Sequence, residues 1–226
     1  METKTYLAPC PHCGAIKRVT FSTNDWWKTK YIFWSDSRIE SDDWCERAFI
    51  HACDECGKFF LLPNPKTLQV DETPCAPTQI LPYQTLQTAI EELAGDEMAE
   101  PRARLEYWWS YNAFYKSETE IPMEENQFYC DNMRWLVNFY TPRAKRFDHI
   151  VFELNRLLGR KDICLQMIDN LTYEEFMRQK IEFRKEKGIT SPIDEELLKE
   201  RYNTEIKELT HALTQPPRPF IKSDFR

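Results

Sequence analysis

Two cysteine pairs of identical form constrain the fold of this chain more than any other feature. The segments CPHCG at 10–14 and CDECG at 53–57 each hold two cysteines separated by two residues, with glycine directly after the second. Thiolates at this spacing lie on a tight turn and occupy two corners of a tetrahedral zinc site, so two such turns fill all four corners. The sequence therefore predicts a structural zinc ion with four thiolate ligands: Cys10, Cys13, Cys53 and Cys56.

The distance between the pairs is long for a zinc ribbon. Compact ribbons separate their pairs by about 15 to 20 residues, whereas residues 14–52 lie between the pairs of this chain. We expect a β insertion within the ribbon, and two unrelated surface turns are the competing interpretation. Iron also binds four thiolates, so the metal is open between zinc and iron, with zinc favoured. His12, Cys45 and His51 are substitute ligands or neighbours of the site, and packing is the favoured role of each.

The remaining cysteines do not suggest a disulfide framework. Cys75, Cys130 and Cys164 are scattered along the chain and are predicted to be small core residues. The first ten residues hold no apolar signal segment, and no window reaches the run of about 18 apolar residues that a membrane span needs. We therefore expect a cytoplasmic protein without a membrane segment, in which the paired thiols bind metal.

The residues before position 63 favour short β-strands. Four stretches are rich in β-branched and aromatic residues and are separated by Ser, Asn and Asp. They cover 17–21, 28–34, 47–51 and 58–62. The segment 63–77 contains four prolines and is predicted to be a linker.

From residue 78 the apolar residues follow a helical period. The predicted helices cover 78–94, 101–117, 124–140, 146–158, 161–170, 172–187 and 192–213. Thr172 and Glu175 form a capping box, and Ser191 is the expected cap of the last helix. Gly159 stands where a helix ends in a left-handed residue.

Together these patterns predict an α+β protein built from three segments. A small zinc ribbon with its β insertion and proline-rich linker occupies 1–76, and an all-α domain occupies 77–215. The last segment, 216–226, is predicted to be an extended tail because its prolines cannot continue a helix.

Charge and motif content disfavour several functions. The net charge is −7, and residues 1–76 contain 9 basic against 11 acidic side chains, so binding of nucleic acid is not expected. No glycine-rich loop is present to hold nucleotide phosphates. No hydrolase motif surrounds a histidine, and the pair Glu208 and His211 lacks the second E-x-x-H motif of a di-iron bundle. We therefore expect no enzymatic activity.

The segment 105–115, LEYWWSYNAFY, is the most distinctive part of the helical region. Its apolar residues cover almost the whole circumference of a helix, which favours a central core helix. Leu105 and Trp108 are expected inside. Tyr111 and Tyr115 lie one turn apart, and their hydroxyl groups favour a solvated or interfacial edge. These two tyrosines are the predicted contacts to a partner protein, because the alternative to a core helix is one that lines a binding groove.

Three motifs carry a family resemblance. They are YIFWSDSRIESDDW at 31–44, WWSYN at 108–112 and FELNRLLGRKDICLQMID at 152–169. With the C-x-x-C turns they resemble a group of uncharacterised bacterial proteins in which a zinc ribbon with an internal Trp-Ser-Asp segment precedes a helical region. In those proteins the helical region contains a Trp-Trp-x-x-Asn motif, and the resemblance implies one tetratricopeptide-like hairpin in this chain. Independently, the apolar spacing on both sides of Gly159 favours a helical hairpin, with Cys164 as the small residue at its close approach.

The expected function is that of a non-enzymatic protein-protein interaction module: a structural zinc ribbon followed by tetratricopeptide-like helices that bind another protein. The alternative is a zinc ribbon that binds nucleic acid. Its basic and aromatic face would consist of Lys17, Arg18, Trp26, Trp27, Lys28, Lys30, Trp34 and Arg38.

Overall fold

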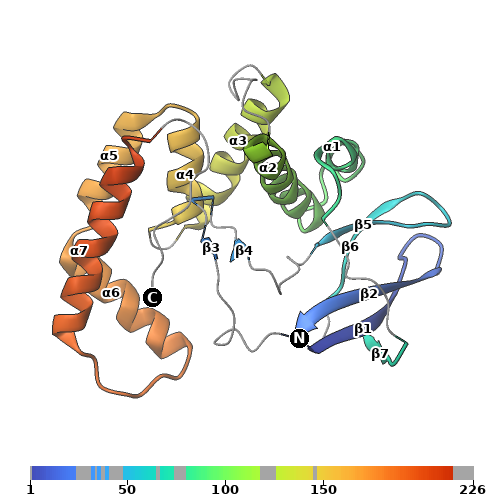
Figure 1. Ribbon diagram of the computed structural model, residues 1–226, viewed down its shortest axis with the longest axis horizontal. Coiled ribbons are helices and arrows are strands. Elements are labelled where there is room, and N and C mark those ends of the chain that lie inside the picture. The colour runs from blue at the N-terminus through green and yellow to red at the C-terminus, as the bar shows by residue number, and fades with distance from the viewer. Residues whose placement is uncertain are drawn as a thin grey trace. The chain divides into compact units, whose positions relative to one another are not determined.

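The structure is a computed structural model of the 226-residue chain. It describes residues 2–23, 32–33, 35–36, 39–40, 48–64, 67–73, 80–117, 126–144 and 147–215. Within these segments the protein is a mixed α+β structure with small antiparallel sheets near the N-terminus and α-helices from residue 83 onward (Figure 1). The predicted α+β class is confirmed.

The largest sheet has three antiparallel strands in the order β2-β1-β7. Its strands are β1 (Glu2–Pro9), β2 (Ile16–Thr23) and β7 (Gln69–Asp71), and two further pairs are formed by β3 (Ile32–Phe33) with β4 (Ile39–Glu40) and by β5 (Ile50–Ala52) with β6 (Phe59–Leu61). Strands β1 and β2 pair over their whole length, from Glu2 opposite Thr23 to Pro9 opposite Ile16. They form a long hairpin whose turn holds the first cysteine pair.

Three of these strands, β1, β4 and β7, lie outside the stretches that the sequence predicted. Strand β1 was not expected, and β7 lies in the segment predicted to be a proline-rich linker. The short strand β7 pairs with β1, where Thr5 lies opposite Asp71. An ion pair of 2.6 Å between Arg18 Nε and Asp71 Oδ2 attaches β7 across the sheet to β2. Neither contact has a local sequence signal, because both join residues about 50 or more positions apart.

The helices agree closely with the helical periodicity. They are α1 (Tyr83–Glu92), α2 (Ala99–Ser117), α3 (Gln127–Tyr140), α4 (His149–Leu157), α5 (Lys161–Asn170), α6 (Tyr173–Glu186) and α7 (Glu195–Ala212). Thr172 caps α6 by accepting a hydrogen bond from Glu175 N, as predicted. The cap of α7 is Asp194 rather than Ser191, because its carboxylate accepts a hydrogen bond from Leu197 N.

The chain folds into two compact units, and the division between them falls between Asn132 and Met133 in α3. Of the described residues, the first unit holds those up to 33, 39–40 and 48–132, and the second holds 35–36 and 133–215. The strands therefore share a unit with α1 and α2, whereas a boundary after residue 76 was expected. Residues 216–226, the predicted tail, lie outside the described residues.

The buried carboxylate of Glu106 explains why α2 groups with the strands. Its side chain is completely buried and accepts hydrogen bonds from the backbone N–H groups of Phe49 and Ile50, at the start of β5. A side chain of α2 thus accepts hydrogen bonds from backbone amides at the start of β5.

The aromatic segment of α2 forms the centre of the first unit. Leu105 and Trp108 are buried, as predicted. Tyr111 is also buried, with 4% of its surface exposed, and its ring stacks on Tyr129 with the centroids 4.4 Å apart. Asn126 Nδ2 donates a hydrogen bond to the Tyr111 hydroxyl, so this polar group is satisfied inside the protein. The prediction of a solvated edge for Tyr111 is therefore wrong.

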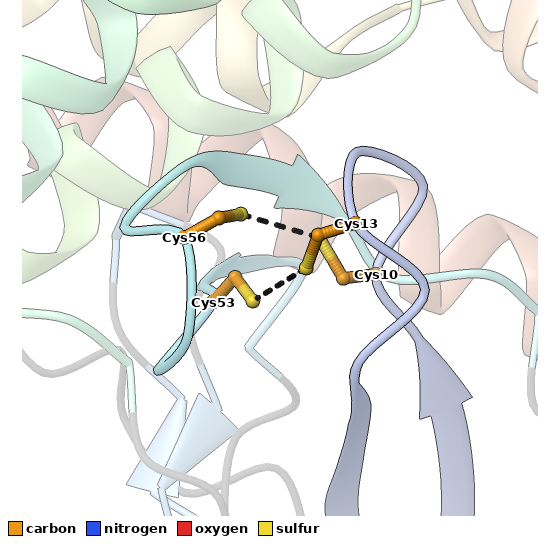
Figure 2. A group of neighbouring side chains, drawn as sticks. All are labelled: Cys10, Cys13, Cys53 and Cys56. Carbon is orange, nitrogen blue, oxygen red and sulfur yellow. Dashed lines mark hydrogen bonds between the residues drawn. The ribbon is translucent and has the colours of Figure 1, made fainter.

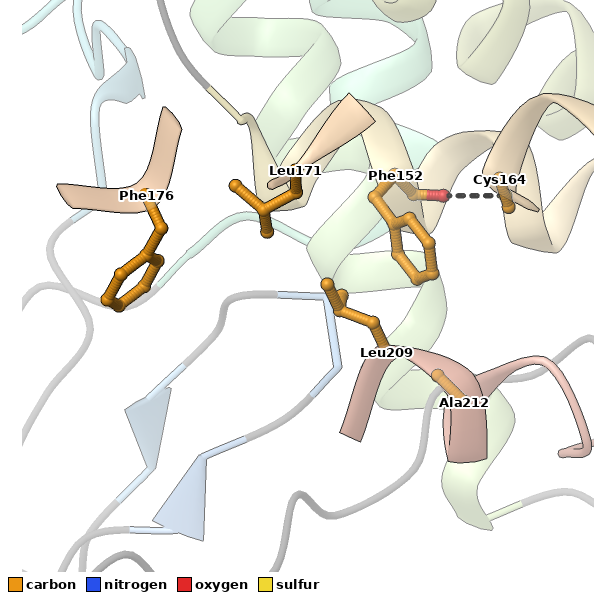
Figure 3. Packing of buried hydrophobic residues seen from close by; sticks show 6 residues of the cluster. All are labelled: Phe152, Cys164, Leu171, Phe176, Leu209 and Ala212. Carbon is orange, nitrogen blue, oxygen red and sulfur yellow. Dashed lines mark hydrogen bonds between the residues drawn. The ribbon is translucent and has the colours of Figure 1, made fainter. Parts of the chain in front are cut away.

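The second unit has its own apolar core. Figure 3 shows six side chains from α4 to α7 that converge there. They are Phe152, Cys164, Leu171, Phe176, Leu209 and Ala212. The thiol of Cys164 donates to the carbonyl oxygen of Phe152 at 3.5 Å, which places a small residue where α5 approaches α4. Cys130 and Cys164 are buried, as predicted for small core residues, and Cys75 lies outside the described residues.

Among the described residues, no helix combines the length and the apolar character that crossing a membrane requires.

Candidate metal centre

The four paired cysteines lie on two hairpin turns of the same kind in the first unit. Cys10 and Cys13 belong to the turn between β1 and β2, and Cys53 and Cys56 belong to the turn between β5 and β6. In each turn the glycine amide donates to the carbonyl of the first cysteine, from Gly14 to Cys10 and from Gly57 to Cys53, at 2.9 Å in both cases.

The glycine of each turn adopts a positive φ that a residue with a side chain rarely adopts. Its value is 77° at Gly14 and 70° at Gly57. The chain can therefore reverse directly after the second cysteine and continue into the next strand. The two C-x-x-C-G motifs thus favour this backbone geometry whether or not a metal is bound.

The four sulfur atoms converge on one point between the turns (Figure 2). Cys10 Sγ lies 3.8 Å from Cys56 Sγ, Cys13 Sγ lies 3.6 Å from Cys53 Sγ, and all four lie within 4.8 Å of one another. Four thiolates around zinc at a Zn–S distance of about 2.3 Å would be separated by roughly 3.8 Å along each edge of the tetrahedron. The two turns thus bring the predicted ligands together at the spacing that a metal of this size requires.

Backbone amides in the turns favour the thiolate form of the cysteines. The N–H groups of Cys56 and Glu55 donate to the Cys53 sulfur and lower its pKa to about 6. Ala15 N–H donates in the same way to Cys13, but partial desolvation and the hydrogen bonds with the three neighbouring sulfurs outweigh this bond and raise the pKa of Cys13 to about 12. Four thiolates at this distance repel one another, so they lose all their protons together only when a cation lies among them.

The ligands are half protected from solvent. Cys10 and Cys53 are buried and pack with Phe60 and Ala15, whereas Cys13 and Cys56 are exposed. This small apolar cluster lies beneath the buried sulfurs and limits access of water to the centre from that side.

The neighbouring histidines are not part of the sulfur cluster. His12 Nε2 lies 3.1 Å from the carbonyl oxygen of Phe59, so its ring connects the first turn to β6. His51 is buried, with its Nε2 3.4 Å from the carbonyl oxygen of Ala48. Cys45 lies outside the described residues. His51 is buried, in line with the packing role expected for it, whereas the side chain of His12 is exposed.

Lys17 supports the centre in a way that the sequence did not indicate. Its ammonium group donates to the carbonyl oxygen of Ala52 at 2.9 Å and to Asp54 Oδ1 at 3.1 Å. A residue of β2 thereby holds the turn that carries the second cysteine pair. No local pattern identifies such a contact, because it depends on the two hairpins meeting in space.

The donor set fits zinc as a structural ion. Four thiolates on two tight turns complete a tetrahedron and leave no coordination position for a water molecule or substrate. The amide donors to the sulfurs would stabilise the negative charge that four thiolates bring to a divalent ion. The chemistry that this arrangement supports is cross-linking of the β1-β2 and β5-β6 hairpins.

Among the described residues, neither Tyr111 nor His211 belongs to the cysteine cluster. Tyr111 lies in the core of the first unit, and the side chain of Tyr115 lies outside the described part of the chain. His211 is exposed, and its Nε2 lies 2.9 Å from Gln215 Nε2 in the last turn of α7.

Comparison with protein-family models, with curated proteins and with solved structures finds no match for this chain.

Proposed function

We propose that this protein is a non-enzymatic protein-protein interaction module whose N-terminal fold is held together by a structural zinc ion. The observation that carries the proposal is the cluster of four cysteine sulfurs within 4.8 Å of one another. A site with four thiolate ligands has no open position for catalysis, which favours a structural role. The remainder of the chain then supplies the binding surface.

The helical hairpin α4-α5 supports the interaction role. The two helices pack against each other on either side of Gly159, which adopts a φ of 71°, and Cys164 lies at their close approach. We propose that this hairpin is a tetratricopeptide-like unit, since such units pair two short helices around small residues and bind extended or helical segments in their grooves.

The nucleic-acid alternative is less favoured by the charges of the first unit. Lys17 is paired with Asp54, and Arg18 is paired with Asp71. Basic side chains that already have carboxylate partners contribute less to phosphate binding. The other six residues proposed for a basic and aromatic face, between 26 and 38, lie outside the described residues.

Substitution of one ligand tests the structural metal. The purified protein should contain one equivalent of zinc, and Cys53→Ser should release it and unfold the β5-β6 hairpin, because ligand binding and folding of such sites are coupled. Elemental analysis with thiol titration measures the metal and the free thiols. Cys130→Ala, which removes a buried thiol away from the centre, is the matched control and should keep its zinc. Less than half an equivalent of metal in wild-type protein, with all eight thiols reactive, would contradict the proposal.

The interaction role requires a separate test. Affinity capture of the tagged full-length chain from its native cells, with quantitative mass spectrometry, should enrich a protein partner that rebinds the purified chain at a fixed stoichiometry. Failure of every enriched protein to rebind would argue against an interaction module while leaving the metal result unaffected.

A further inference from the structure

A cavity of about 730 Å³ runs along the helical hairpin of the second unit. Its walls come from the C-terminal part of α3, from α4 and α5, and from the first turns of α6. We call it the α4-α5 groove. Its volume lies in the range of pockets that bind ligands in proteins, roughly 300 to 1,000 Å³.

The middle of the α4-α5 groove is apolar. Its lining includes the apolar side chains of Val137, Phe147, Val151, Met167 and Leu171. Ile163, Asn170 and Thr172 also line it and are solvent-exposed, so the groove opens to solvent along α5. A chain longer than the groove can therefore enter and leave it, which a closed cavity would prevent.

One end of the groove carries the positive charge of Arg160. This residue lies between α4 and α5, and its guanidinium Nη1 donates a hydrogen bond to Asn155 Oδ1 at 3.3 Å. Among the residues that the structure describes, no carboxylate lies within ion-pair distance of Arg160. Asn155 is 2% exposed, and its Nδ2 donates to the carbonyl oxygen of Val151. The side chain that accepts the hydrogen bond of Arg160 is therefore itself held in place. A half-buried guanidinium with most of its donors available is a binding site for a carboxylate.

The opposite end of the groove carries negative charge. Asp148 caps α4, and the hydrogen bonds that it accepts from Ile150 N and Val151 N both go to Oδ1. No cation lies within ion-pair distance of Asp148 in the described segments, so Oδ2 faces no opposite charge there. Glu175 lines the same end but is already paired with Arg178 at 2.6 Å. Asp148 is thus the available acceptor for an incoming cation.

The two ends are separated by the length of α4. Nine helical residues span about 13.5 Å at a rise of 1.5 Å per residue. An extended peptide covers this distance in about four residues. We propose that the α4-α5 groove binds an extended segment of a partner protein that carries an acidic and a basic side chain about four residues apart, with apolar residues between them. The acidic side chain pairs with Arg160 and the basic one with Asp148.

This inference deepens the proposed interaction role and rests on it. Charge complementarity at both ends favours a segment with opposite charges at fixed spacing, because burying either Arg160 or Asp148 beneath an uncharged ligand would cost desolvation without a compensating ion pair. The apolar floor between them contributes the nonspecific part of the affinity.

Titration with synthetic peptides tests the groove in the zinc-bound, full-length protein. The probes are two blocked peptides, Glu-Val-Leu-Ala-Lys and its reverse, and two single-charge versions in which Gln replaces either Glu or Lys. Isothermal titration gives Kd, and NMR shifts of the Asn155 and Arg160 side-chain groups locate the binding. The peptide should bind in one of its two residue orders with a Kd below about 1 mM, and each single-charge version should bind at least about tenfold more weakly.

Variants of the two ends separate a charge effect from a structural effect. Arg160→Gln and Asp148→Asn should each weaken the charged peptide at least about tenfold, and Asn at position 148 keeps the helix cap. Arg160→Glu should reverse the preference, so that a peptide with Lys in place of Glu binds more tightly than the original. Lys161→Gln is the control, because it removes one positive charge, as Arg160→Gln does, from an exposed residue outside the groove. It should leave the Kd of the peptide unchanged. Zinc content and thermal unfolding of each variant establish that it is folded.

Several results would overturn the inference. They are no saturable binding of either two-charge peptide up to 1 mM, NMR shifts that map away from the groove, and equal affinity of the two-charge and single-charge peptides. Tighter binding of the small zwitterion 8-aminooctanoate than of both peptides would assign the groove to a metabolite instead of a protein segment. A partner captured by the full chain that binds elsewhere would overturn the groove and leave the interaction role standing.

Discussion

Glu153 and Arg156 form an ion pair that is almost completely removed from water. Their side chains are 2% and 3% exposed, and the guanidinium donates twice to the carboxylate, from Nε at 2.6 Å and from Nη2 at 2.7 Å. The hydroxyl of Ser35 donates to the same carboxylate at 2.5 Å. The Trp-Ser-Asp segment noted in the sequence thus places Ser35 and Asp36 inside the second unit, where both are buried.

Removal of one partner of this pair should be costly. Arg156→Met leaves the Glu153 carboxylate buried without its cation, and we expect a loss of about 3 to 5 kcal/mol in the free energy of unfolding. The double variant with Glu153→Leu should recover a large part of this loss, because no charge is then left buried. Urea unfolding followed by circular dichroism measures both variants. Equal stabilities of the single and double variants would show that the pair does not act as described.

At the scale of elements, α2 is joined to the second hairpin by the side chain of Glu106. Glu106→Leu would leave the backbone N–H groups of Phe49 and Ile50 without their acceptor, and an unsatisfied buried donor costs about 1 to 3 kcal/mol. We expect a loss of stability of this order, with faster hydrogen exchange of both amides. Glu97→Leu, at an exposed glutamate before α2, is the control and should change neither quantity. Unchanged exchange at the two amides in Glu106→Leu would contradict the role of this carboxylate.

The ion pair that attaches β7 to β2 requires the ionised carboxylate of Asp71, so this contact should weaken at low pH. The hydrogen bond from Arg18, together with the amide of Thr73, lowers the pKa of Asp71. Because the folded pKa lies below the unfolded value of about 3.9, the stabilisation is complete above that value and is lost as the pH falls through the folded pKa. The stability difference between wild type and Asp71→Asn should therefore be constant above about pH 5 and shrink below about pH 4. Thermal unfolding of both proteins across this range measures it, and a constant difference down to about pH 2 would contradict the assignment.

At the scale of the whole molecule, the net charge of −7 and the ion pairs of Lys17 and Arg18 oppose binding of nucleic acid. We expect no binding of single-stranded or duplex DNA or RNA near physiological salt, measured by fluorescence anisotropy with labelled oligonucleotides. Salt-sensitive binding below about 1 µM would support the alternative function, since release of counterions makes such binding depend steeply on salt.

The local parts of this structure could be predicted from the sequence. The helices follow from apolar periodicity, and the start of α6 follows from Thr172, because these signals act within one or two turns of the chain. The clustering of the four paired cysteines could also be predicted, since each C-x-x-C-G turn specifies its own geometry through a glycine with positive φ. These features needed no knowledge of which segments meet in space.

Other features were decided only by the tertiary structure, because each depends on contacts between segments that are distant in the sequence. Strand β7 exists because β1 pairs with it, and Glu106 is buried because the amides of Phe49 and Ile50 lie opposite it. Tyr111, which its hydroxyl suggested was at an edge, is buried because Asn126 satisfies that hydroxyl. The sequence by itself determined which segments are helical and which thiols can bind metal. Only the packing of distant segments decided which polar groups find partners in the interior, and therefore which of them could be buried.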